Sequence, residues 1–331
     1  MEKALERKRI CSAVFLDISQ AFDRVWYKGL LHKLRSILPY QFFLLLKSYL
    51  TDRKFRIRQE DVCSKLKDIC VGVPQGSVLG PVLYLLYIND IPETYNTSIA
   101  TFADDTALLA VGNTLEESKG RLQQAVNNVA TWTKKWRIKL NESKSTYINF
   151  TNKRIDNVPI SINGVCLQPA NTAKYLGMNL DVKLRWSEHV KKKVEELNIK
   201  HRKMYLLLGR HSELATESKL LLYKQVLRPV WTYGIQLWGC SKKTHTEKIQ
   251  RFQNKVLRSI VNAPKYVRVT DLHRDLGVEM VTDMVPKHAN SHKGRLEQHI
   301  NEEASRLLMS RFTFRRLKRS KPFELSTSPH N

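Results

Sequence analysis

Short apolar runs separated by polar stretches fill the first half of the chain, and they predict a sheet. The run 11–16 (CSAVFL) carries no charge and predicts a buried strand. Two apolar runs within 99–111 flank a polar pair, which is the pattern of a β-hairpin. Residues 146–150 predict another strand. A second hairpin is expected over 159–168, because Asn163-Gly164 is typical of a type I′ turn.

Helical signals lie between these strands. Short helices are expected over 28–38, 40–50 and 82–88. Thr114 and Glu117 form a capping box that opens a longer amphipathic helix. We expect an α+β fold whose core sheet is antiparallel, with helices on one face.

Residues 54–58 alternate between basic and apolar side chains. Phe55 and Ile57 fall on one face, while three basic residues fall on the other. The pattern predicts a half-buried strand with a basic face. Residues 66–73 are its expected antiparallel partner.

The pattern changes after Asp181, where strand signals end. Helical periodicity continues over 187–208, 212–228 and 245–262. Residues 182–224 hold eleven Lys or Arg and five Glu, a net charge of +6. We therefore place a domain boundary at 181.

The net charge of the chain indicates what kind of molecule it binds. The 331 residues include 56 Lys or Arg against 31 Asp or Glu, which gives a formal charge of +25. Such a field concentrates polyanions, and nucleic acid is the leading candidate. An anionic membrane surface is the alternative. The run 311–321 has six Lys or Arg; it is interpreted as a nuclear import signal, an RNA-binding arm or a solvated terminus.

Other sequence features favour an intracellular protein. No apolar run is long enough to span a bilayer, and the first residues lack the apolar core of a secretory signal. The five cysteines form no CxxC pair and no zinc-like cluster, so we expect reduced thiols in the core.

Three carboxylates are the candidate chemistry. Asp17 follows the buried strand 11–16 directly, and Asp104-Asp105 sits within the hairpin 99–111. Each alone is an ordinary turn or capping residue. Adjacent carboxylates among apolar residues raise each other's pKa, and a divalent cation with a preference for hard oxygen ligands would relieve that cost. A basic protein with such a site points to nucleotidyl transfer by two metals.

These residues lie in ordered motifs that resemble a known family. The segments 16–23 (LDISQAFD), 72–81 (GVPQGSVLGP) and 102–105 (FADD) occur in that order, followed by 140–144 (LNESK), 175–177 (YLG) and 228–234 (RPVWTYG). The sequence resembles the reverse transcriptase of non-LTR, LINE-type retrotransposons, and is most similar to jockey-like elements. The resemblance covers about residues 10 to 290.

The resemblance implies a right-hand polymerase fold and its metal site. Residues 1–181 would form the palm with partial fingers at 40–73, residues 182–262 a helical thumb, and residues 263–331 a helical C-terminal extension with a basic tail. Two Mg²⁺ ions, with Mn²⁺ as a substitute, would be bound by Asp17, Asp104, Asp105 and the carbonyl of Ile18.

The resemblance also assigns roles around the metals. Phe22 would pack beneath the incoming sugar and exclude a ribose, and Pro74, Gln75 and Gly76 would contact the nucleotide. Lys144 would protonate the departing pyrophosphate, with a solvated turn lysine as the alternative. Tyr175-Leu176-Gly177 would form the primer grip. Asp23 receives no role.

The implied activity is RNA-directed DNA synthesis, with template RNA, a DNA primer and dNTPs as partners. Only about ten residues precede the first motif, where the family has a substantial fingers region, so the chain resembles an N-terminally truncated element and weak or absent extension is expected. The competing interpretation is a catalytically inactive nucleic-acid-binding remnant. The expected location is the nucleus, after assembly with RNA in the cytoplasm. The oligomeric state is left open.

Overall fold

The computed structural model describes residues 1–308, 317 and 322–326. The basic run 311–321 therefore lies almost entirely outside the described residues. The chain divides into two compact units, residues 3–176 and 177–331. The boundary expected at 181 falls inside the second unit, at the end of its first strand.

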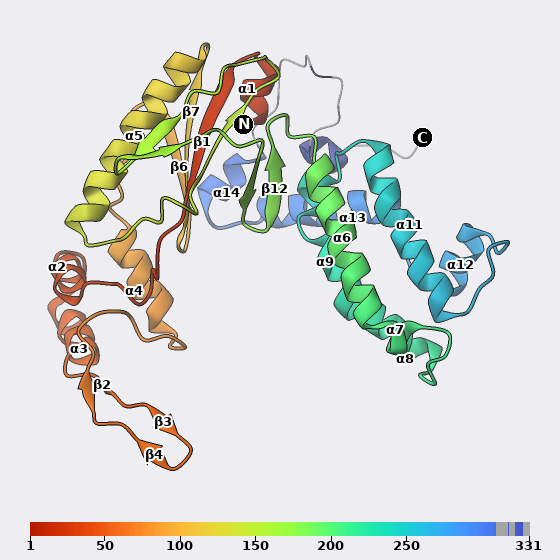
Figure 1. Ribbon diagram of the computed structural model, residues 1–331, viewed down its shortest axis with the longest axis horizontal. Coiled ribbons are helices and arrows are strands. Elements are labelled where there is room, and N and C mark those ends of the chain that lie inside the picture. Colours follow the sequence, from red (N-terminus) through yellow and green to blue (C-terminus); the bar gives the residue numbers. More distant parts are fainter. Residues whose placement is uncertain (309–316, 318–321, 327–331) are drawn as a thin grey trace. The chain divides into compact units, whose positions relative to one another are not determined.

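A four-stranded antiparallel sheet forms the centre of the first unit (Figure 1). Its order is β6-β7-β1-β8, and the strands are β6 Thr97–Phe102, β7 Asp105–Gly112, β1 Ile10–Leu16 and β8 Thr146–Phe150. Every residue of β1 is buried, because neighbours pair with it on both sides. The strand predicted from 11–16 and the hairpin predicted over 99–111 are both confirmed.

Helix α5 (Leu115–Lys135) covers one face of this sheet (Figure 1). It begins as predicted, since the Glu117 backbone N–H donates to Thr114 Oγ1 at 3.2 Å. The Glu117 carboxylate accepts from the Asn113 backbone N–H at 2.6 Å, one residue earlier than in a standard capping box. Apolar residues of α5 lie in one core with Val14 and Leu108 of the sheet. The predicted α+β class, with helices on one face of an antiparallel sheet, is confirmed.

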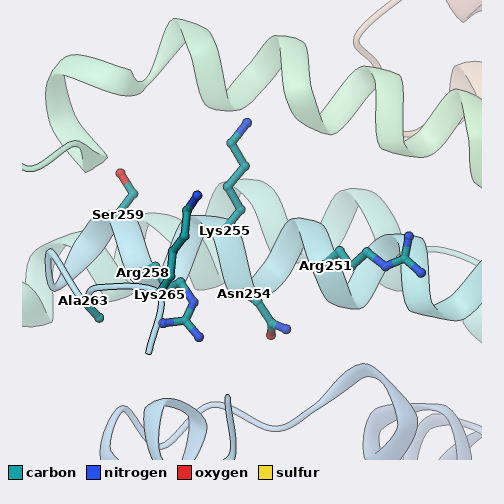
Figure 2. Close-up of a pocket in the computed structure, with 7 residues that line it drawn as sticks. All are labelled: Arg251, Asn254, Lys255, Arg258, Ser259, Ala263 and Lys265. Atoms are coloured by element: carbon teal, nitrogen blue, oxygen red, sulfur yellow. The ribbon is translucent and has the colours of Figure 1, made fainter. Parts of the chain in front are cut away.

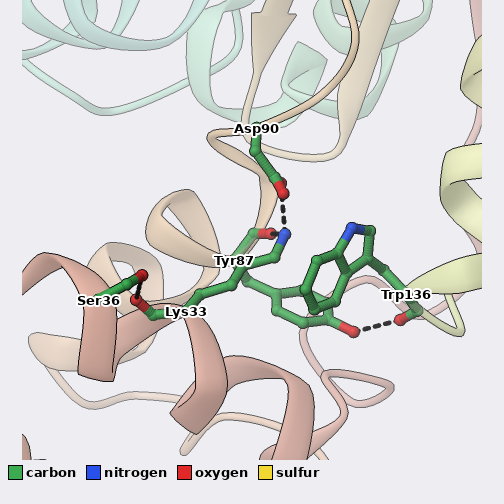
Figure 3. A network of polar contacts seen from close by, with 5 residues as sticks. All are labelled: Lys33, Ser36, Tyr87, Asp90 and Trp136. Carbon is green, nitrogen blue, oxygen red and sulfur yellow. Dashed lines mark hydrogen bonds and ion pairs between the residues drawn. The ribbon is translucent and has the colours of Figure 1, made fainter.

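The remaining helices of this unit are short: α1 Glu2–Glu6, α2 Tyr27–Ile37, α3 Tyr40–Leu50 and α4 Leu79–Ile88. A buried lysine joins two of them to the end of α5 (Figure 3). Lys33 Nζ donates to the Tyr87 carbonyl at 2.5 Å and to the Asp90 carboxylate, and it lies 3.6 Å from the centre of the Trp136 ring. Burial lowers the pKa of Lys33, while Asp90 opposes the shift. The paired charge therefore links α2, the end of α4 and the turn after α5.

The half-buried strand predicted over 54–58 is wrong in its burial. Two short ladders form there instead: β2 Lys54–Phe55 with β5 Lys67–Asp68, and β3 Arg58–Gln59 with β4 Val62–Cys63. All eight strand residues are exposed. We call residues 54–68 the ribbon. It pairs only with itself, so its apolar side chains have no second layer to pack against.

The hairpin predicted over 159–168 is confirmed as β9 Ile160–Ile162 and β10 Val165–Leu167. Asn163 and Gly164 both have positive φ, as a type I′ turn requires. Strand β11, Thr172–Tyr175, follows. The expectation of core cysteines is wrong for most of them. None of the five forms a disulfide, but only Cys11 is buried, because the others lie on short ladders, loops and helix ends.

The described residues of the second unit begin with strand β12, Met178–Asp181, and continue with helices, as the periodicity predicts. Its helices are α6 Ser187–Lys203, α7 Tyr205–Leu208, α8 Thr216–Leu222, η1 Tyr223–Leu227, α9 Arg228–Thr232, α10 Ile235–Trp238, α11 Lys243–Ile260, α12 Val269–Asp275, α13 Val281–Glu297, α14 Glu302–Arg306 and η2 Pro322–Ser326. Trp231, Trp238 and Tyr223 are fully buried and fill its core. Within the described part of the chain, no helix has the length and apolarity to cross a membrane.

Candidate active site

Strand register brings the three candidate carboxylates to one edge of the sheet. The last pair between β1 and β7 is Leu16 with Thr106, so Asp17 and Asp105 occupy the next positions on neighbouring strands. Asp104 lies in the tight turn that joins β6 to β7, after Ala103, whose φ is 52°. Asp17 thus lies beside two aspartates that are 87 and 88 positions later in the sequence. We call the cluster of Asp17, Asp104 and Asp105 the acid edge.

The pKa of Asp105 is shifted by the neighbouring carboxylates. Burial raises the pKa of Asp105, and the neighbouring charges of Asp104 and Asp17 raise it further. Asp104 also contributes to the raised pKa of Tyr84, after burial. Asp17 is half-buried, whereas Asp104 and Asp105 are exposed. One carboxylate is therefore fixed in the fold, and the pair faces solvent.

The exit of β1 is held by a loop that also carries Lys144. The Asp17 backbone N–H donates to Ser145 Oγ at 3.2 Å, and the Asn141 N–H donates to the Asp17 carbonyl at 2.8 Å. The Ser19 N–H donates to the Lys139 carbonyl at 2.9 Å, so Asp17 and Ser19 make the bonds that flank the Ile18–Leu140 bridge.

Asp17, Ile18 and Lys144 consequently line one open pocket of about 390 Å³. Two cations that sequence reasoning missed, Arg24 and Lys139, line it as well. Both could have been found from their closeness to the motifs in the sequence, because Arg24 directly follows the first motif and Lys139 lies five positions before Lys144. The pocket therefore combines one carboxylate with three positive side chains, a composition suited to a phosphate ester.

The first and second motifs are joined by hydrogen bonds. The Val73 N–H donates to the Phe22 carbonyl at 2.8 Å, and the Gly72 N–H donates to the Val25 carbonyl at 2.9 Å. Gln75 Nε2 donates to Asp23 Oδ1 at 2.6 Å, which gives Asp23 a contact that the sequence did not suggest.

Glycine is required at Gly72. Its φ is +86°, and a Cβ there would lie 2.8 Å from the Asp23 carbonyl oxygen. Pro74 is half-buried, and Gln75 and Gly76 are exposed beside this junction. A ligand therefore has access to these side chains.

Phe22 and Tyr175 lie beside the acid edge. The Phe22 ring is 4.8 Å from the Tyr84 ring, whose pKa responds to Asp104. The Tyr175 ring is 4.8 Å from the Phe15 ring, and burial and then Asp105 raise the pKa of Tyr175. The next residues, Leu176 and Gly177, have φ of 45° and 71°, so the chain turns sharply there.

The donor set at the acid edge fits a divalent cation. Carboxylate oxygens are the hard ligands that Mg²⁺ prefers, and a cation would relieve the repulsion that raises the pKa of Asp105. In the part of the chain that the structure describes, no three His, Cys, Asp or Glu side chains are already arranged as a metal site. The carboxylates are thus adjacent, and their side chains are not yet gathered around one point.

Comparison with known proteins agrees with this geometry. Residues 1–180 match the family described as reverse transcriptase (RNA-dependent DNA polymerase). The chain is 42% identical to the probable RNA-directed DNA polymerase from transposon X-element of Drosophila melanogaster, over 98% of this chain and 36% of that protein. It is 39% identical to the corresponding protein from transposon BS, over 96% of this chain and 36% of that one.

A third relative is the RNA-directed DNA polymerase from mobile element jockey of Drosophila melanogaster, 36% identical over 92% of this chain and 34% of that protein. The chain spans about a third of the length of these relatives. Among solved structures, telomerase from Candida tropicalis with a fragment of telomeric RNA gives a distant likeness, with 11% identity and a TM-score of 0.42 over 83% of this chain and 51% of that chain. The family match and these relatives show that the chain belongs to the reverse transcriptase family and carries a domain of the non-LTR retrotransposon type.

Proposed function

We propose that this chain catalyses RNA-directed DNA synthesis at the acid edge. The observation that carries the proposal is the convergence of Asp17, Asp104 and Asp105, which the raised pKa of Asp105 records. Relatives that are 36% to 42% identical are named RNA-directed DNA polymerases. The substrates would be template RNA, a DNA primer and dNTPs.

The reaction forms a bond between the primer 3′-oxygen and the α-phosphorus of the dNTP and breaks the bond to pyrophosphate. The three carboxylates and the Ile18 carbonyl would hold two Mg²⁺ ions, which when bound supply the positive charge that favours loss of the hydroxyl proton to water and that offsets the charge of the leaving group. Asp17 is held for this role by its backbone bonds to Asn141 and Ser145. Lys144 lines the same pocket and would donate a proton to the departing pyrophosphate.

Neighbouring residues would select and position the substrates. Phe22, held against Tyr84, would exclude a ribose 2′-hydroxyl, and Gln75, held by Asp23, would contact the nascent base pair. Tyr175-Leu176-Gly177 would press the primer end toward the acid edge. The family's mode of transposition would place the working protein in the nucleus.

Primer extension on an RNA template tests the proposal. The purified chain would be compared with its Asp104→Asn variant and with Asp156→Asn, which changes an exposed aspartate on a loop of the same unit. We expect Mg²⁺-dependent extension that Asp156→Asn retains and that Asp104→Asn reduces by about 10³-fold, as loss of a transition-state electrostatic contact does.

The alternative is a nucleic-acid-binding protein without catalysis. It predicts no extension by any of the three proteins while each still binds an RNA–DNA duplex. Extension that survives Asp104→Asn would also contradict the proposal, because the reaction would then take place without the acid edge.

A further inference from the structure

A second site lies in the second unit, along α11. A pocket of about 490 Å³ is lined by Arg251, Lys255 and Arg258 of the helix and by Lys265 of the loop that follows (Figure 2). Among the residues that the structure describes, no Asp or Glu lines this pocket. Residues 243–268 contain seven Lys or Arg and one Glu. The pocket is therefore strongly cationic.

Two of its cations are already engaged within the protein. Arg258 donates to the carbonyls of Pro264 at 2.6 Å and Val267 at 2.7 Å, which fixes the loop after α11 against the helix. Arg251 pairs with Glu247 at 3.4 Å, one turn earlier in the helix. Arg258 therefore builds the wall of the pocket and is poorly suited to hold a ligand.

Lys255 and Lys265 are the cations left to a ligand. Both are exposed, and neither has a carboxylate within 4.0 Å in the described part of the chain. Burial and then the charge of Lys255 lower the pKa of His201, a buried residue of α6. The positive charge of Lys255 therefore acts on the neighbouring helix α6.

An exposed aromatic residue lies next to the pocket in sequence. Tyr266 directly follows Lys265 in the loop and is 86% exposed, although burying an aromatic side chain is ordinarily favourable. Lysines that contact phosphates beside an exposed ring that accepts a base are the composition of sites for single-stranded nucleic acid. Duplex bases are already stacked on each other and cannot stack on such a ring.

We propose that Lys255, Lys265 and Tyr266 bind a short unpaired segment of nucleic acid, with phosphates on the lysines and one base on the tyrosine. The site does not include the acid edge and needs no catalysis. RNA and DNA single strands share this chemistry, so both are tested.

The test measures binding of fluorescent single strands of about 12 nucleotides, and of a blunt-ended duplex of two separate strands, to the full chain without dNTPs. We expect Lys255→Gln with Lys265→Gln to weaken single-strand binding about tenfold and to reduce its dependence on salt. Tyr266→Ala should weaken the single strands about tenfold and leave duplex affinity within about twofold.

Matched controls separate the pocket from the overall charge. Lys8→Gln with Lys134→Gln removes two exposed positive charges from the first unit, and Tyr95→Ala removes a tyrosine that is 89% exposed there. Equal losses in these controls would overturn the proposal, as would equal losses of duplex and single strand in Tyr266→Ala. Loss on either the RNA or the DNA arm supports it, and loss on neither overturns it. The assay contains no dNTPs and measures binding alone, so failure of the polymerase proposal would not affect this result.

Discussion

Two antiparallel hairpins in the first unit differ sharply in what covers them. The β6–β7 hairpin is backed by β1 and α5, and Leu108 within it is only 2% exposed. The ribbon 54–68 pairs only with itself, and its Phe55 is 44% exposed. The alternating sequence of 54–58 predicted a half-buried strand in the ribbon, which the fold does not supply with a covering layer. A strand therefore acquires a buried face only when the fold supplies a second layer, and that layer also keeps the acid edge in place.

The largest effect expected from this difference is on stability. Leu108→Ala should lower the free energy of unfolding by about 2–5 kcal/mol, because it leaves a cavity in the core. Phe55→Ala on the ribbon should cost about 1 kcal/mol or less, because nearly half of that side chain is already exposed. The midpoints of urea unfolding of the two variants measure the contrast. Equal losses would mean that the ribbon is packed in solution and that the contrast is wrong.

Much of this organisation was predictable from the sequence. The uncharged run that ends at Leu16 predicted a central strand, and the register of that strand then placed Asp17 opposite Asp105. The contacts that hold the site were not predictable. Asp23 and Gln75 are 52 positions apart, as Asp17 and Ser145 are 128 apart, and such pairings depend on how loops pack. Periodicity reports which face a side chain occupies, and it carries no information on what lies opposite.

The segment that returns from the ribbon to the acid edge gives a second, smaller expectation. Asp23 holds Gln75 at 2.6 Å where the exposed region ends and the site begins. If Asp23 is a positioning residue, Asp23→Ala should raise the KM for dNTP about fivefold with little change in kcat, the equivalent of one hydrogen bond of about 1 kcal/mol. Steady-state primer extension measures both constants.

The conservative variant distinguishes positioning from charge. In Asp23→Asn the side-chain oxygen can still accept from Gln75 Nε2, so the KM should stay near that of the unaltered chain. Gln75→Ala should match Asp23→Ala, and the double variant should add little. A KM raised equally by Asn and Ala at position 23 would show that the charge matters and that the hydrogen bond to Gln75 does not.

The smallest expected effect is a change in thermal stability, which distinguishes the carboxylates at the tip of the β6–β7 hairpin from those of the ribbon. The raised pKa of Asp105 means that the folded state binds a proton more tightly than the unfolded state does. Stability therefore falls as pH rises from the unfolded pKa of Asp105 through its folded pKa.

Asp105→Asn removes the repulsion from Asp104 and Asp17. In EDTA at neutral pH it should raise the thermal midpoint by about 1–2 °C, a small gain because the site is exposed to solvent. Below about pH 3 the gain should vanish, since the aspartate is then largely protonated in both states. Asp68→Asn on the ribbon, where the carboxylate lies 3.8 Å from Lys54, should give no gain at either pH. A gain of the same size in both variants would mean that the change in net charge, and not the repulsion among carboxylates at the acid edge, causes the gain in thermal midpoint.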